Sequence, residues 1–222
     1  MSTLPLRWRN DHMFLEVEDG LWLLDTGAPT SFGASSTLAF AGEEFQLDNS
    51  YFGLTPDTLS GYVGMACAGL LGADVLGRFD FIFDIPGEQV VLSGQPLEHD
   101  GVAVPLDSFM GIPVVSPRIR GTAYRMFFDT GAQVGYFQHD SLADFPSAGR
   151  IDDFYPGIGS FETETYHVDV QLGGIDFTLR CGALTGLLGA TLELAGTQGI
   201  IGNQLLRDRR VGYFPRRHLL VL

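Results

Sequence analysis

Apolar and polar residues alternate along several short stretches of the chain, and turn-forming residues separate these stretches. The clearest case covers residues 166–172 and 175–179, which lie on either side of Gly173 and Gly174. Alternation with a period of two is typical of half-buried β-strands, and glycines between two such runs favour a hairpin turn. This part of the chain is therefore predicted to form a β-hairpin.

Two more hairpins are expected, at residues 13–24 with a turn at Asp19-Gly20 and at residues 114–128 with a turn at Gly121. Asp-Gly between apolar runs is a strong hairpin signal. The 222 residues include 29 Gly, 11 Pro, 17 Phe and 7 Tyr, a mixture expected of many short strands joined by tight turns. Pattern and composition together predict an all-β fold.

Two motifs occur twice each, in the same order. Leu-Leu-Asp-Thr-Gly-Ala at residues 23–28 returns as Phe-Phe-Asp-Thr-Gly-Ala at residues 127–132, and Gly-Leu-Leu-Gly at residues 69–72 returns as Gly-Ile-Ile-Gly at residues 199–202. Repetition of two motifs in order indicates an internal duplication. It predicts two lobes related by a pseudo-twofold axis.

The second motif continues in both copies into a short helix-like stretch, at residues 74–78 and 204–208, and then into a strand, a turn and a strand. Residues 93–104 have the composition of a linker. We therefore place an N-terminal lobe at residues 1–98 and a C-terminal lobe at residues 99–222. The stretch at residues 186–190 repeats the Gly-Leu-Leu-Gly-Ala of the first lobe and is a rival for the packing strand of the second, but its continuation does not match.

One Asp-Thr-Gly turn after a strand is weak evidence for a function, since Asp and Gly are ordinary turn residues. Two copies in related lobes predict that Asp25 and Asp129 meet. Carboxyl groups held about 3 Å apart cannot both ionise, so the pair would keep one proton. The ionised member could then take a proton from a water while the other donates one to a substrate carbonyl, which is general acid–base hydrolysis of an amide.

The neighbours of each aspartate have expected roles of their own. Gly27 and Gly131 allow the backbone to bend and bring its N–H toward the carboxylate. The hydroxyl groups of Thr26 and Thr130 are expected to brace the opposite turn.

On these residues the chain resembles the pepsin/retropepsin superfamily of aspartic proteases, from residue 13 to residue 222. In that family the paired turns carry the catalytic aspartates, and an apolar-apolar-Gly segment packs behind each turn. The resemblance implies a two-lobed acid-protease-like fold, catalysis by Asp25 and Asp129, and no metal or other cofactor. Ala28 and Ala132 are similar to the retroviral type, whereas the secreted type has Ser or Thr there. Without that hydroxyl donor the dyad should be less acidic, which predicts a mildly acidic pH optimum.

Family members cover the dyad with a mobile hairpin, the flap. The chain between Asp129 and Gly199 is longer than that between Asp25 and Gly69, so the second lobe has room for it. Residues 155–160, Tyr-Pro-Gly-Ile-Gly-Ser, resemble the tip of the pepsin flap, although in pepsins the flap belongs to the first lobe.

The resemblance makes Tyr155 the candidate flap tyrosine, with Gly157 and Gly159 in the tip. Two alternatives remain open. Residues 154–160 can be a plain Gly/Pro loop, or the flap aromatic can come from the first lobe, where Tyr51, Phe52 and Tyr62 are candidates.

The formal net charge of −14 argues against nucleic acid as a partner, because a phosphate backbone would be repelled. The arginines at residues 207–217 are expected to form a solvated turn. No apolar run approaches the roughly 20 residues that span a bilayer, and the N-terminus lacks the apolar core of a signal peptide. Cys67 and Cys181 are expected to be reduced thiols. These features predict a cytoplasmic protein without a membrane partner. A lone-lobe protease that needs a homodimer is not expected, because one chain already contains both Asp-Thr-Gly turns, so the protein is predicted to be a monomer.

The sequence thus favours an aspartic endopeptidase that binds a peptide or protein substrate in extended conformation. The competing prediction is a catalytically silent peptide- or protein-binding module on the same fold. A serine triad at residues 139–141, His-Asp-Ser, is not expected, since adjacent residues point apart.

Overall fold

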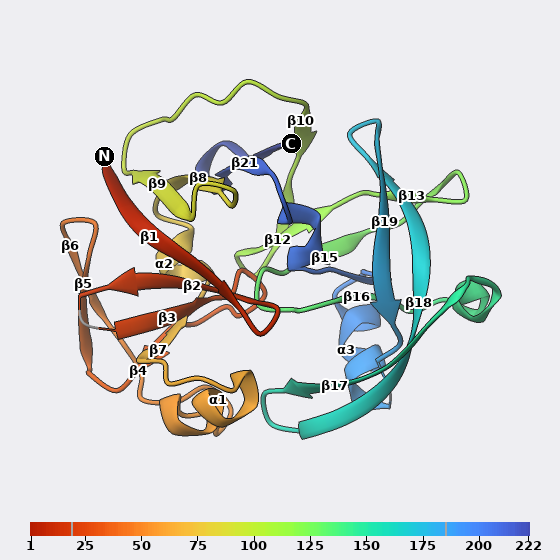
Figure 1. The fold of residues 1–222 in the computed structure, drawn as a ribbon, viewed down its shortest axis with the longest axis horizontal. Coiled ribbons are helices and arrows are strands. Elements are labelled where there is room, and N and C mark those ends of the chain that lie inside the picture. Colours follow the sequence, from red (N-terminus) through yellow and green to blue (C-terminus); the bar gives the residue numbers. More distant parts are fainter. Residues whose placement is uncertain (19, 185) are drawn as a thin grey trace.

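A computed structural model describes residues 1–18, 20–184 and 186–222. Over these residues the chain forms two ten-stranded sheets and one two-stranded sheet, with a few short helices around them (Figure 1). The predicted all-β class is confirmed.

The first sheet has the strand order β10 (Ala103–Pro105), β22 (Leu219–Val221), β21 (Arg210–Phe214), β8 (Asp80–Asp84), β9 (Gln89–Ser93), β1 (Ser2–Arg9), β2 (His12–Val17), β3 (Gly20–Leu24), β7 (Gly69–Leu71), β4 (Phe32–Gly33). The second sheet has the order β11 (Asp107–Phe109), β12 (Ile112–Val115), β15 (Met126–Phe128), β20 (Gly199–Ile201), β16 (Gly135–Phe137), β19 (Ile175–Gly182), β18 (Gly159–Leu172), β13 (Arg118–Ile119), β14 (Thr122–Ala123), and β17 (Ser147–Tyr155) pairs with the first part of β18. The remaining elements are β5 (Thr37–Phe40), β6 (Glu43–Gln46), α1 (Pro56–Val63), α2 (Ala73–Leu76), α3 (Leu187–Leu194) and the 3₁₀ turns η1 (Asp140–Asp144), η2 (Asn203–Leu206) and η3 (Pro215–Arg217).

The two copies of the repeated motifs have the same strand pairing. β3 runs parallel to β7, and β4 runs antiparallel to it. In the second copy β15 runs parallel to β20, and β16 runs antiparallel to it. The glycine that opens each second motif permits this close packing. A Cβ on Gly69 would lie 2.2 Å from the carbonyl oxygen of Phe32, and one on Gly199 would lie 2.1 Å from that of Tyr136.

Short helical turns follow the second motif in both halves, as α2 and η2, close to the helix-like stretches expected from the sequence. The rival Gly-Leu-Leu-Gly stretch is not a strand, because the chain is α-helical from Leu187 to Leu194. The preference for Gly199–Ile201 as the packing strand is confirmed.

The hairpin at residues 166–179 is confirmed as β18 and β19, with positive φ angles of 61° and 82° at Gly173 and Gly174. Strands β2 and β3 form the hairpin expected at residues 13–24; Asp19 of its predicted turn lies outside the described residues.

The hairpin predicted at residues 114–128 is confirmed. Strands β12 and β15 pair Val114 with Phe127, and β13 and β14 continue the same register, with Ile119 opposite Thr122 and a turn at residues 120–121. Between the two ladders the N–H of Tyr124 donates to the carbonyl oxygen of Pro117 at 2.9 Å, and β13 also pairs with β18 on its other side.

One sheet contains strands from both halves of the chain, since β8 of the first half pairs with β21 of the second. Beside this junction Asp80 is fully buried and accepts hydrogen bonds from Arg216 at 3.0 Å and Arg217 at 2.7 Å. A buried carboxylate requires such cationic partners. The expectation that all the C-terminal arginines form a solvated turn is therefore wrong for these two.

Residue 98 lies between β9 and β10, outside any strand, and the division of the chain into lobes there stays a prediction. Cys67 and Cys181 are free thiols, as expected. No helix in the described ranges has both the length and the apolar character that crossing a bilayer demands.

Candidate active site

Each Asp-Thr-Gly turn begins at the end of a buried strand and is held there by the second motif. The backbone N–H of Asp25 donates to the carbonyl oxygen of Leu71 at 3.0 Å, and that of Asp129 donates to Ile201 at 2.9 Å. Strand β7 thus fixes the first turn and β20 fixes the second.

The two threonines join the turns to each other. The hydroxyl oxygen of Thr130 accepts from the N–H of Thr26 at 3.1 Å, and that of Thr26 accepts from the N–H of Thr130 at 3.0 Å. Each hydroxyl also donates across the junction, from Thr26 to Phe128 at 2.6 Å and from Thr130 to Leu24 at 2.9 Å. Both threonines are fully buried, so these four bonds are shielded from water.

The aspartates lie above this junction with their carboxyl groups hydrogen-bonded to each other. One oxygen of Asp25 accepts from Gly27 and Ala28, at 2.9 and 2.8 Å. In the second turn the backbone N–H groups that follow Asp129 donate to it at 2.8 and 3.3 Å. Asp25 and Asp129 therefore meet, as the repeated motif predicts.

Each turn passes directly beneath the opposite carboxyl group. A Cβ on Gly27 would lie 2.3 Å from an oxygen of Asp129, and a Cβ on Gly131 would lie 2.7 Å from an oxygen of Asp25. Only glycine fits at either position. Backbone bending is the role that the sequence predicts for these glycines, and the close approach to the partner carboxylate is a second reason for them.

Burial raises the pKa of both carboxyl groups, and the negative charge of Asp129 raises that of Asp25 further. The hydrogen bond from Asp25 works in the opposite direction on Asp129, because it stabilises the ionised form. The pair therefore retains one proton above the range in which an isolated aspartate would have lost it.

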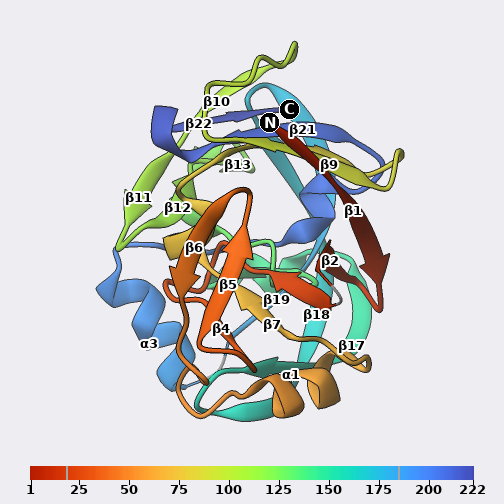
Figure 2. The same cartoon turned by 90° about the vertical axis from the view of Figure 1, so that its left-hand side faces the viewer.

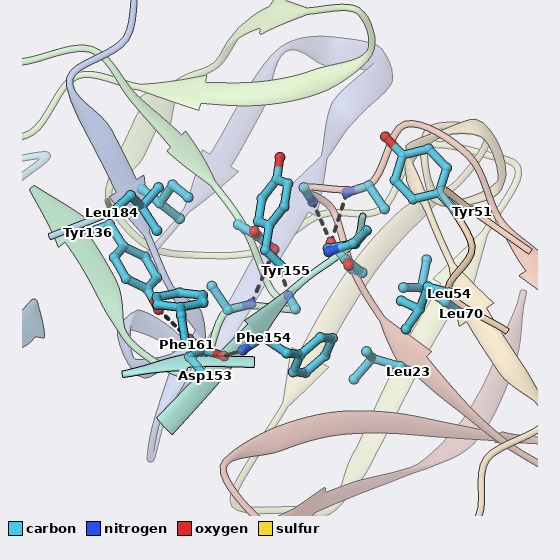
Figure 3. A pocket seen from close by; sticks show the side chains of 18 residues that line it. Leu23, Tyr51, Leu54, Leu70, Tyr136, Asp153, Phe154, Tyr155, Phe161 and Leu184 are labelled. Atoms are coloured by element: carbon cyan, nitrogen blue, oxygen red, sulfur yellow. Dashed lines mark hydrogen bonds between the residues drawn. The ribbon is translucent and has the colours of Figure 1, made fainter. Parts of the chain in front are cut away.

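A cavity of about 80 Å³ opens over the dyad, and its lining divides into two sides (Figure 3). Apolar residues from the first half line one side: Leu23, Leu54 and Leu70, with Tyr51 at the edge. The second half contributes the other side: Tyr136, Phe161, Leu184 and Asp153. Ala28 and Ala132 also line the cavity, and neither has a hydroxyl to donate to the dyad.

A long hairpin made of β17 and β18 covers the cavity, and Tyr155 ends its first strand. Figure 3 shows the Tyr155 ring between the two sides of the cavity. Burial and then the charges of Asp129 and Asp25 raise the pKa of Tyr155, so its hydroxyl stays neutral. In the tip, Gly157 and Gly159 have φ angles of 80° and 92°, which favour glycine. Residues 154–160 are therefore a hairpin tip rather than a plain loop.

The first-half aromatics lie where this hairpin meets the first half. Figures 1 and 2 both place the hairpin beside α1. There the ring of Tyr62 stacks on Phe154 with ring centres 4.7 Å apart, and a Cβ on Gly157 would lie 3.5 Å from Phe52. Tyr51 reaches the cavity itself, so it and Tyr155 are the two aromatic alternatives that line the site.

Sequence reasoning missed four residues of this region. Tyr136 donates a hydrogen bond to Asp153, and neither of the two was a candidate. Phe154 stacks on Tyr62 of the first half, and the buried ring of His12 meets Phe154 edge to face with ring centres 6.2 Å apart. A residue-by-residue comparison of the two halves would have found one of them, since Tyr136 in the second half stands where the first has Phe32.

No model of a known protein family matches the chain, and comparison with curated proteins gives no match either.

Proposed function

We propose that this protein is an aspartic endopeptidase in which Asp25 and Asp129 activate a water molecule to hydrolyse peptide bonds. The observation that carries the proposal is the pair of buried carboxyl groups, hydrogen-bonded to each other at the floor of a covered cavity. The proposal includes a duplicated, acid-protease-like fold, supported by the matching strand pairing around each aspartate. It also includes a monomer acting in the cytoplasm.

The proposed reaction needs one proton on the pair and one water between the carboxyl groups. The ionised carboxylate takes a proton from the water, whose oxygen attacks the peptide carbonyl carbon, while the protonated carboxyl donates its proton to the carbonyl oxygen. The protonated carboxyl then gives its proton to the amide nitrogen while the other carboxylate takes one from a hydroxyl of the tetrahedral intermediate, so the C–N bond breaks and the pair again carries one proton. The reciprocal hydrogen bonds between Thr26 and Thr130 favour this cycle, because they hold both turns in fixed register.

A substrate must displace the covering hairpin. A buried water needs about 10 to 15 Å³ of such space, so a cavity of about 80 Å³ holds a few waters and no peptide. Binding of an extended chain therefore requires the hairpin to lift and the Tyr62–Phe154 contact to separate. The lifted strands offer backbone groups with which an extended peptide could pair.

The test is digestion of a proteome-derived peptide library by the purified protein, with and without a pepstatin-type inhibitor. We expect cleavage that the inhibitor blocks and that Asp25→Asn and Asp129→Asn both abolish. Cleavage that persists in both variants would exclude the mechanism. Binding of peptides without any cleavage by the wild type would instead favour a silent binding module.

A further inference from the structure

The two sides of the cavity differ in one chemical respect. The first-half side consists of aliphatic side chains with a tyrosine at its edge, whereas the second-half side contains an acid, Asp153, among apolar and aromatic residues (Figure 3). Asp153 belongs to β17 of the covering hairpin, and its negative charge is near enough to raise the pKa of Asp129. A charge in this position faces whatever side chain a substrate places on that side.

Strand register shows how the second half holds this acid. Phe32 pairs with Leu70 in the first half, and Tyr136 pairs with Ile200 in the equivalent place of the second. The tyrosine differs from the phenylalanine by a hydroxyl group, and this hydroxyl donates to the carboxylate of Asp153. The backbone N–H of Phe154 donates to the other carboxylate oxygen at 2.8 Å.

Burial raises the pKa of Asp153, and these hydrogen bonds oppose that shift because they stabilise the ionised form, while they also orient the carboxylate. None of the ion pairs between described residues includes it. The donors around it are a phenol, a backbone amide and the side-chain amide of Gln133, all of them uncharged. An ionised carboxylate has about four acceptor sites, so capacity for a further donor remains. A charge in an apolar cavity is costly until a cation pairs with it.

We propose that Asp153 makes this enzyme selective for substrates with a basic side chain, lysine or arginine, on the second-half side of the scissile bond and an apolar side chain on the other. This inference rests on the proposed function, since it describes the same cleft. A basic side chain entering there would form a charge-assisted hydrogen bond with Asp153 in surroundings largely closed to water. The formal net charge of −14 adds to this preference, because it attracts cationic peptides to the protein.

The experiment compares two sets of peptides that have leucine on one side of the cut and either lysine or norleucine on the other, in both orientations. Norleucine keeps the aliphatic stem of lysine and lacks the charge. We expect the wild type to favour lysine by about tenfold or more in kcat/KM in one orientation. Asp153→Asn, which keeps an acceptor for Tyr136, should bring that ratio to about one.

Asp152→Asn is the matched control, because it removes an exposed acid from the neighbouring position of the same strand, and it should leave the ratio near the wild-type value. Tyr136→Phe gives the second half the side chain of the first, frees Asp153 to move and should lower the ratio partway. If Asp153→Asn does not fold, the effect of Tyr136→Phe on the ratio tests the inference. Cleavage with equal rates for lysine and norleucine, or a lysine preference that both variants retain, would overturn the inference and leave the protease proposal standing.

If the wild type cleaves neither peptide, the proposed function fails, and binding decides the inference separately. Calorimetry on the wild type should then show the lysine peptide binding about tenfold more tightly than the norleucine peptide, with the difference lost in Asp153→Asn. Equal affinities would overturn it.

Discussion

The two halves of the molecule agree closely around the aspartates and differ in what surrounds them. Each half supplies a turn of the same sequence, the same parallel and antiparallel partners, and a threonine that bonds to the other turn. Between turn and packing strand, however, the first half has the small sheet of β5 and β6 and helix α1, whereas the second has the long β17–β18 hairpin and helix α3. Symmetry is kept where the carboxyl groups are positioned and lost where a substrate would be held.

The largest expected effect concerns the symmetric part. Asp25→Asn and Asp129→Asn should each lower kcat by about a thousandfold or more, because either change removes one of the two proton-transfer groups. Glu98→Gln, at a side chain that is 93% exposed, should behave as the wild type in the same peptide assay.

The pH–rate profile of the wild type should be bell-shaped. Activity is lost at high pH when the raised pKa values release the shared proton, and at low pH when the second carboxyl group is protonated. A profile that peaks below about pH 3 would contradict the mildly acidic optimum expected from Ala28 and Ala132.

Next in size are the threonines. Thr26→Val and Thr130→Val each keep the shape of the side chain and remove a hydroxyl that makes one accepting and one donating bond, so buried partners are left unsatisfied. We expect each to lower the free energy of unfolding by about 3 kcal/mol, equally within error. Urea unfolding measures this.

Thr197→Val is the matched control for these variants, because its buried hydroxyl donates to the carbonyl oxygen of Leu192 within the second half. Its loss should be about 1 kcal/mol. A large difference between the losses of unfolding free energy in Thr26→Val and Thr130→Val would show that the two turns are not equivalent.

A smaller effect tests the contact between the halves at His12. Burial lowers the pKa of this ring to about 4, and its Nδ1 has no hydrogen-bond partner among the residues that the structure describes. Between pH 6.5, the ordinary pKa of histidine, and about pH 4, the unfolded chain binds a proton at this ring and the folded protein does not. The free energy of unfolding therefore falls as the pH is lowered through this range.

His12→Leu should therefore lose less stability than the wild type between about pH 7 and pH 4.5, with a difference of about 2 kcal/mol. Urea unfolding at the two pH values measures it, and His139→Gln, at an exposed ring, is the control. The same pH dependence in His12→Leu and the wild type would show that this ring is not the group responsible.

The smallest effect distinguishes the two tyrosines of the cavity. Tyr155→Ala should lower kcat/KM on a peptide by about tenfold, because it removes the ring that lies over the dyad, and Tyr51→Ala should lower it less. Tyr155→Phe separates the contribution of the ring from that of the hydroxyl. An unchanged kcat/KM in Tyr155→Ala would assign the flap to another segment.

The elements that the sequence predicted well are those encoded by neighbouring residues. The β18–β19 hairpin follows from alternation around Gly173 and Gly174, and the packing strands follow from the glycines that let β4 and β16 pass closely. The meeting of Asp25 and Asp129 could be expected because the motif is repeated, and repetition carries information about space that a single copy lacks.

What could not be predicted depends on partners distant in sequence. The carboxylate of Asp80 pairs with Arg216 and Arg217, which lie more than a hundred residues later in the sequence, and no local pattern predicts that pairing. Asp153 looks like an ordinary surface acid next to Asp152 until β17 is seen to cross the cavity. In both cases the fold first brings the charges together, and only then does their chemistry become visible.

The ladder between β8 and β21 has a consequence for any attempt to take the molecule apart. A fragment that ends between β9 and β10 would leave the backbone groups of β8 bare along an apolar edge, and the complementary fragment would leave β21 in the same condition. Bare edges of this kind recruit strands from other chains. Fragments cut there and mixed should recombine with each other, while either one produced alone should self-associate and precipitate.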